Sequence, residues 1–139
     1  MAITQAMCTS FKTEALSGVH DLDTDVIKLA LFTSAATLNA ATTAYSSASE
    51  SAGTGYTPAG NTLSGASISS DGTTATVTFS PTTWANATFV SRGALIYNSS
   101  KANKAIAVLD FGADQTVSAG DFAVIFPAAT ASDAIIRIS

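Results

Sequence analysis

The C-terminal part of the chain, Gly93–Ser139, reads GALIYNSSKANKAIAVLDFGADQTVSAGDFAVIFPAATASDAIIRIS. Clusters of Ser, Asn, Gly, Asp and Pro divide it into four apolar runs, Ala94–Tyr97, Ala105–Phe111, Phe122–Phe126 and Ile135–Ile138. Short runs rich in Ile, Val and Phe between turn residues are typical of β-strands. The run Ala105–Phe111 carries apolar side chains on both faces of an extended chain, so we expect it to be a central strand covered on both sides.

Further strands are predicted upstream of this region. Val26–Thr33 is strongly apolar, and Asp71-Gly72 between Ala66–Ser70 and Thr73–Phe79 is a strong hairpin signal. In the second strand of that hairpin we expect Ala75, Val77 and Phe79 to face the core and the intervening threonines to face solvent. Trp84–Val90 fits either a short strand or a helical turn. The whole predicts an all-β, mainly antiparallel protein of about seven or eight strands, a jelly-roll or Ig-like β-sandwich.

A helix is predicted only at the N-terminus. Within residues 2–18, Ile3, Met7, Phe11 and Ala15 recur at intervals of four. Gly18 stands where a C-terminal glycine cap is expected. We therefore predict one domain, residues 1–139, in which residues 1–20 form an amphipathic helix, or alternatively an arm that becomes ordered on assembly.

The segment Ala35–Ser64 is the least regular part of the chain. It is rich in Ser, Thr, Gly and Ala, which predicts a long surface loop. A loop of this length is usually functional or ordered by a partner, although simple flexibility is the alternative.

Composition limits the possible functions. Charged residues make up 12% of the chain, whereas about 25% is typical, and a surface with few charges is suited to burial against other subunits. An exposed Ser/Thr-rich β face is the alternative explanation. The net charge is −4 and the six basic residues are scattered, so we expect no nucleic-acid binding. We expect no signal peptide, no membrane span, synthesis in the cytoplasm, and Cys8 buried as a small apolar residue.

Candidate chemical motifs are weak. His20 beside Asp21 lacks a positioned nucleophile, and the calcium-like run Asp21–Asp25 lacks the Gly and Glu that an EF-hand loop requires. Carboxylate pairs drawn from Asp110, Asp114, Asp121 and Glu50 have no feature that selects one pair. We therefore predict no catalytic residue, no metal site and no cofactor. Tyr45, Tyr56 and Trp84 form either a stacking platform for sugars or part of the core.

Four segments carry a resemblance that extends over nearly the full length: MAITQAMCTSFK at the start, SRGALIYN at Ser91–Asn98, AIAVLDFGAD at Ala105–Asp114 and FPAATASDAIIRIS at Phe126–Ser139. They resemble small virion proteins of tailed bacteriophages and prophages. The resemblance implies a viral structural protein of the capsid surface, similar to head decoration or cement proteins. The implied partner is the major capsid protein, with self-association into a dimer or another homo-oligomer on the virion.

The segments outside the expected β body are the predicted contact regions of such a protein. We expect Phe11 and Leu16 of the N-terminal segment and Tyr45 and Tyr56 of the loop to lie at the partner interface. The alternative function is a tail-fibre or receptor-binding module that recognises carbohydrate, which requires an exposed Tyr45/Tyr56/Trp84 cluster.

Overall fold

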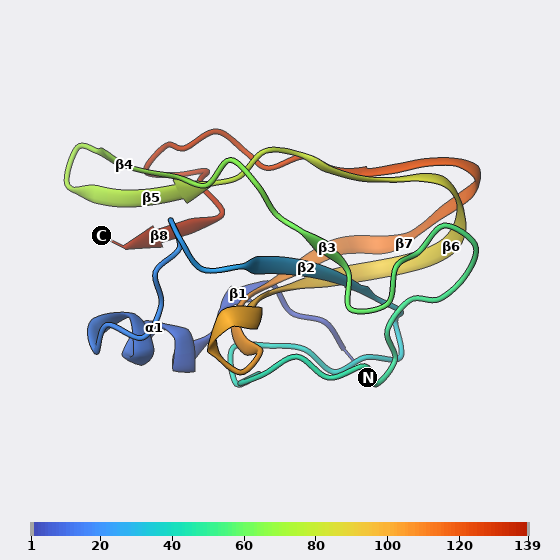
Figure 1. Cartoon of the computed structure of the whole chain (residues 1–139), viewed down its shortest axis with the longest axis horizontal. Coiled ribbons are helices and arrows are strands. Elements are labelled where there is room, and N and C mark those ends of the chain that lie inside the picture. Colours follow the sequence, from blue (N-terminus) through green and yellow to red (C-terminus); the bar gives the residue numbers. More distant parts are fainter. Residues whose placement is uncertain (1, 139) are drawn as a thin grey trace.

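Two long antiparallel strands, β6 and β7, give the molecule its shape (Figure 1). The computed structural model describes residues 2–138. Its elements are β1 (Ala6–Met7), α1 (Thr9–Leu16), β2 (Ile27–Phe32), β3 (Asn61–Thr62), β4 (Ser67–Asp71), β5 (Thr74–Thr78), β6 (Thr82–Asn98), the 3-10 turn η1 (Ser99–Lys101), β7 (Lys104–Val124) and β8 (Ile136–Ile138). They form an antiparallel five-stranded sheet, β1-β7-β6-β2-β3, and a three-stranded sheet, β4-β5-β8. The predicted all-β sandwich is confirmed.

The β6–β7 ribbon contributes to both layers because it bends back on itself. Figure 1 shows the two strands running along the lower layer, turning upward and returning over the top. Their pairing shifts register between Trp84 and Ala87, between Ala87 and Phe89, and between Ser91 and Gly93. Such β-bulges bend a strand pair without ending it. The sequence runs that we expected to be separate strands are therefore joined, Trp84–Val90 with Ala94–Tyr97 in β6, and Ala105–Phe111 with most of Phe122–Phe126 in β7.

The inner half of β7 is the predicted central strand. Ala105 to Val108 are at most 2% exposed, and β7 lies between β6 on one side and the short β1 on the other. Both faces of this stretch are therefore covered, as its apolar pattern predicts.

The predicted hairpin is present, with a register that differs by one residue. Asp71 pairs with Thr74, so the two residues at the turn are Gly72 and Thr73 rather than Asp71 and Gly72. Only Gly72 of these has a positive φ, +61°. A glycine at the first turn position satisfies that requirement without strain.

The expected inside and outside of β5 are partly wrong. Val77 and Phe79 are buried as expected, but Ala75 is exposed while Thr76 is fully buried. The Thr76 hydroxyl lies 3.0 Å from the Ser69 hydroxyl, which makes its burial acceptable. The segment after β7 is bonded to this side of the sheet, since Ala131 N–H donates to Asp71 and the Thr78 hydroxyl donates to Pro127 O. This segment crosses the face of the sheet that carries the threonines of β5, which explains why that face is covered.

The N-terminal helix is shorter than predicted. It spans only Thr9–Leu16, because residues 2–7 are extended: Ile3 bridges Leu38, and Ala6 and Met7 pair with the free edge of β7. Strand pairing gives hydrogen-bond partners to the main-chain groups at the edge of β7. These groups would have no partner there if the whole N-terminal segment were helical. The N-terminal segment is therefore part of the β body and not an arm outside it.

Two local predictions for this segment are confirmed. Gly18 (φ +77°) ends α1, with Val19 N–H donating to Glu14 O and Gly18 N–H donating to Ala15 O, the pattern of a Schellman cap. Cys8 is fully buried at the start of the helix, where its N–H donates to Ile106 O of β7. Burial raises the pKa of its thiol to about 11, with a smaller contribution from the charge of Glu14.

Gly60 and Gly72 give a matched test of how the loop before β3 fits β2. Both have positive φ, but a Cβ on Gly60 would lie 1.9 Å from Leu29 O, whereas one on Gly72 would meet nothing within 4 Å. We expect Gly72→Ala to lower the free energy of unfolding by about 1–2 kcal/mol, the cost of a left-handed backbone. Gly60→Ala should cost at least twice as much, because it also pushes the loop away from β2. Urea denaturation measures both, and equal losses would show that the close approach is unimportant.

Candidate functional site

The four predicted contact residues do not form one surface. Leu16 is 88% exposed and Tyr45 is partly buried, but Phe11 is 2% exposed and Tyr56 is 9% exposed. Phe11 and Tyr56 therefore pack within the chain, and the expectation that they contact a partner disagrees with their burial. Leu16 alone projects fully into solvent.

The expected sugar-binding platform is not exposed either. Tyr56 and Trp84 stack with ring centroids 5.9 Å apart, and Trp84 is 2% exposed. Phe89 packs edge-on against both rings. Tyr45 lies apart from this group and stacks on Tyr97 at 4.6 Å. These aromatic rings belong to the core, where such geometries stabilise packing.

The loop Ala35–Ser64 is irregular but tightly attached to the edge of β2. Ser51 N–H donates to Leu31 O (2.8 Å), Thr33 N–H donates to Ser49 O (2.9 Å), and Leu63 N–H donates to Ile27 O (2.8 Å). Between these points the loop backbone leaves β2, and there the Tyr56 hydroxyl accepts from Leu31 N–H at 3.0 Å. A side chain thus supplies the acceptor that a neighbouring strand would supply in a regular sheet.

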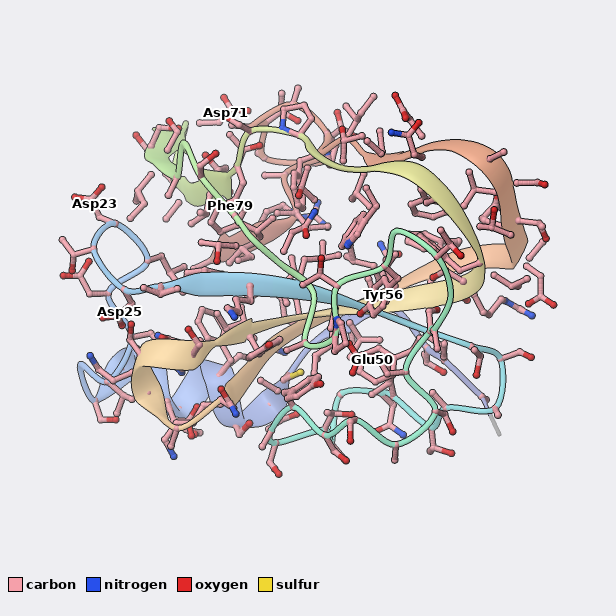
Figure 2. The ribbon with its side chains drawn as sticks, turned by 45° about the vertical axis from the view of Figure 1, so that its right-hand side comes forward. Asp23, Asp25, Glu50, Tyr56, Asp71 and Phe79 are labelled. Carbon is pink, nitrogen blue, oxygen red and sulfur yellow. The ribbon has the colours of Figure 1, made fainter. Side chains whose placement is uncertain are left out.

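Glu50 holds that arrangement together (Figure 2). One carboxylate oxygen accepts from the Tyr45 hydroxyl at 2.6 Å, and the other accepts from the Tyr56 hydroxyl and from Ala59 N–H at 2.8 Å. Tyr97 completes the group by donating to Ala59 O at 2.6 Å. Bonds to a charged acceptor are about twice as strong as neutral ones.

The environment of Glu50 keeps the surrounding phenols protonated. Burial raises the pKa of Tyr97 to about 12, with a smaller contribution from the charge of Glu50. Burial also raises the pKa of Tyr45 and of Tyr56, and the hydrogen bond that each donates to Glu50 adds to the effect. The group therefore consists of a carboxylate acceptor and protonated phenol donors. Its geometry indicates a structural role, the attachment of the loop to β2.

Sequence reasoning placed Glu50 among unselected carboxylates and missed this role. A signal for it existed, since Glu50 is the only charged residue between Ala35 and Ser64. Two of the three tyrosines of the chain lie within six residues of it. A lone charge in a long uncharged segment requires partners if it is buried.

His20 lies in a second buried network, with Glu14 rather than with Asp21. Its side chain is 1% exposed, Nε2 lies 3.0 Å from Glu14 Oε1, and Nδ1 lies 3.0 Å from Asn98 Nδ2. The Asn98 amide is oriented by two other partners, because Nδ2 also donates to Asp25 and Oδ1 accepts from Ser100 N–H. His20 Nδ1 is therefore an acceptor, and Nε2 carries the proton toward Glu14.

This network joins α1 to the turn between β6 and β7. Lys101 Nζ lies 3.1 Å from Asp25, and Lys104 Nζ lies 3.5 Å from Glu14. The hydrogen bond from Asn98 is the main reason that the pKa of Asp25 falls to about 2. Sequence reasoning did not identify Asn98, which is fully buried at the end of β6.

The acidic bend Asp21–Asp25 is stabilised by its own backbone. The Asp21 carboxylate accepts from the N–H groups of Asp23 and Thr24, and Asp25 accepts from Asp21 N–H. Among residues 2–138, no three His, Cys, Asp or Glu side chains are grouped so that they could hold a metal ion. Nor does any helix in that range have the length and apolar content to cross a bilayer.

Apart from Val26 (43% exposed) and Val90 (38%), the exposed large apolar side chains of residues 2–138 lie in two regions. Leu16, Ile68 (55% exposed) and Ile138 (52%) border depressions between α1 and the β4-β5-β8 sheet. Ile125 (74%) borders a separate depression beside Phe111 and Phe122, which lie on β7. These regions are the strongest candidates for contact with other molecules.

Substitutions of Glu50 test whether this carboxylate holds the loop against β2. We expect Glu50→Gln to lower the free energy of unfolding by about 1–2 kcal/mol, because one oxygen becomes an amide donor facing a donor. Glu50→Ala should cost about 3 kcal/mol, since it leaves Ala59 N–H and two hydroxyls without their acceptor. Asp114→Asn, at an exposed position, removes the same charge and should change little. Urea denaturation that shows equal effects for Glu50→Gln and Asp114→Asn would contradict this role.

High pH tests the phenols directly, because all three tyrosines of the chain belong to this group. Below the ordinary pKa of 10.0 the phenols are protonated in both states, so stability does not depend on them. Between about pH 10 and pH 12 the unfolded chain loses phenol protons that the folded chain keeps. The free energy of unfolding should then fall by at most about 1.4 kcal/mol per pH unit for each tyrosine. Phenolate absorbance should rise together with unfolding, and an early rise in the folded protein would contradict the assignment.

Comparison with protein-family models gives no match, and comparisons with curated proteins and with solved structures give none either. Any functional statement therefore depends on the residues and surfaces described above.

Proposed function

We propose that this protein is a structural component of a tailed-bacteriophage virion, a decoration or cement protein bound to the outside of the head. In this proposal its partner is the major capsid protein, it self-associates on the virion, and it stabilises the shell without catalysis or a cofactor. The proposal combines the resemblance of the four sequence segments with the properties of the surface.

The observation that supports it most is the pair of separate apolar regions on a surface with few charges. One region includes Leu16, Ile68 and Ile138, and the other includes Ile125. With charged residues at 12% of the chain, little charge must be desolvated when such surfaces are covered. A protein that contacts several neighbours in a shell requires more than one such surface.

The internal fastening also suits this role. The N-terminal segment that leads to Leu16 is bonded to the sheet through β1, so this contact surface has a fixed position before binding. Prior order reduces the entropy lost on association. A protein that binds only the assembled shell stabilises that state by mass action, and many copies multiply the effect.

The alternative of a carbohydrate-recognition module on a tail fibre has less support. It requires an exposed aromatic platform, whereas Trp84 and Tyr56 are at most 9% exposed. Sugar stacking at these rings would require the loop to detach from β2.

Labelling of intact particles tests the location. We expect gold-labelled antibody against the purified protein to cover the heads, and particles made without the protein to release DNA at a lower temperature. Adding the purified protein back should restore the release temperature, because the bound copies stabilise the assembled shell.

Label confined to the tail tip would favour the tail-fibre alternative. Absence of the protein from purified particles, or turnover of a substrate by the purified protein, would reject the proposal. Particles exposed to an unrelated protein of similar net charge control for non-specific stabilisation.

A further inference from the structure

We infer that the groove between α1 and β8 binds the same groove of a second copy of this chain, forming a two-fold symmetric dimer. The inference specifies the self-association included in the proposed function. It is argued from this one surface, and its test in solution is separate from the location of the protein on particles.

The groove consists of two adjoining depressions of about 410 and 240 Å³ that share Phe11 and Ile138. Helix α1 forms one wall, and the inner face of the β4-β5-β8 sheet forms the other. The sheet face is apolar but incompletely covered, since Ile68 and Ile138 keep more than half of their surface exposed. Apolar surface left open in this way is stabilised by a partner.

Leu16 supplies a projection that fits such a groove. It borders the smaller depression and is the most exposed large apolar side chain of the described residues, at 88%. In a two-fold dimer whose axis passes near Phe11 and Ile138, Leu16 of each copy reaches the larger depression of the other. The chain therefore carries both a protruding apolar group and an empty apolar site.

The charges at the two ends of the groove are complementary under the same symmetry. Exposed Lys12 borders the smaller depression and forms no ion pair within residues 2–138, whereas the guanidinium of Arg137 donates to Ala131 O and Ser132 O. Exposed Asp21 borders the larger depression, and Asp23 lies in the same turn with no bond to its carboxylate within that range. A two-fold axis places the basic end of each copy against the acidic end of the other. This match favours a second copy over an unrelated occupant.

Sedimentation equilibrium of the purified full chain tests the inference. We expect a monomer–dimer equilibrium, with Leu16→Asp raising the dissociation constant at least about 100-fold, because a symmetric dimer loses two buried leucines. Ile125→Asp is the matched control, because Ile125 is similarly exposed but lies outside the groove, and it should leave the constant unchanged.

A charge exchange tests the symmetry. The Lys12→Glu variant should dimerise weakly, because acidic groups then face acidic groups. Mixed with Asp23→Lys, which keeps the bonds that Asp21 makes in its turn, it should form heterodimers above the statistical fraction in native mass spectrometry at low salt. Circular dichroism checks that each variant is folded.

Three outcomes would overturn the inference: a monomer at concentrations of about 100 µM, far above the dissociation constants of stable interfaces; equal effects of Leu16→Asp and Ile125→Asp; or statistical mixing of the charge variants. A monomeric protein that still labels phage heads would reject the dimer and leave the proposed function standing. A protein that dimerises in solution but is absent from particles would reject the proposed function and leave the dimer standing.

Discussion

The hydrogen bond between the Tyr56 hydroxyl and Leu31 N–H is the constraint on which much of this structure depends. It falls where the loop departs from β2, at a main-chain donor that would otherwise have no partner in the sheet. Glu50 fixes the hydroxyl from the other side and also binds Tyr45 and Ala59. An edge strand is thereby closed by a segment with almost no regular structure, which removes a site for unwanted strand pairing.

The other determinant of the architecture is the bent β6–β7 ribbon. Its bulges let the two strands take part in both layers, and Phe89 and Leu95 of β6 belong to the same buried core cluster. Trp84, Phe89 and Phe122 fill the inside of the bend together with Tyr56 from the loop. The loop is thus bonded to the edge of the lower sheet and packed under the upper layer. Attachment of the loop to β2 and packing of the two layers are therefore coupled.

Local patterns in the sequence predicted what local physics determines. The all-β class, the buried stretch from Ala105 to Val108, the Gly72 hairpin and the Gly18 cap depend on alternation and on single-residue backbone preferences. The lengths of β6 and β7 could not be predicted in this way, because Gly and Asp at bulges give the same signal as at turns. Likewise, Ile3 and Met7 fit a helical period, and only tertiary pairing, of Ile3 with Leu38 and of Met7 with the free edge of β7, explains their extended backbone.

The candidate contact surface was predictable only in part. Leu16 is exposed as expected, whereas Phe11 follows the same helical pattern and faces inward. Which apolar residues stay exposed depends on how completely α1 covers the neighbouring sheet, and sequence periodicity carries no information on that. The role of Asn98 depends on partners more than 70 residues away, Asp25 and His20.

Because Cys8 is buried, the reactivity of its thiol reports local opening at the start of α1. The thiolate is the species that reacts with alkylating reagents, and a pKa of about 11 together with complete burial keeps it scarce and covered while α1 is in place. Alkylation therefore proceeds only through conformations in which the start of α1 has moved enough to expose the thiol. Because the chain has one cysteine, the rate at which a single label is added reports the frequency of these openings without any engineered probe.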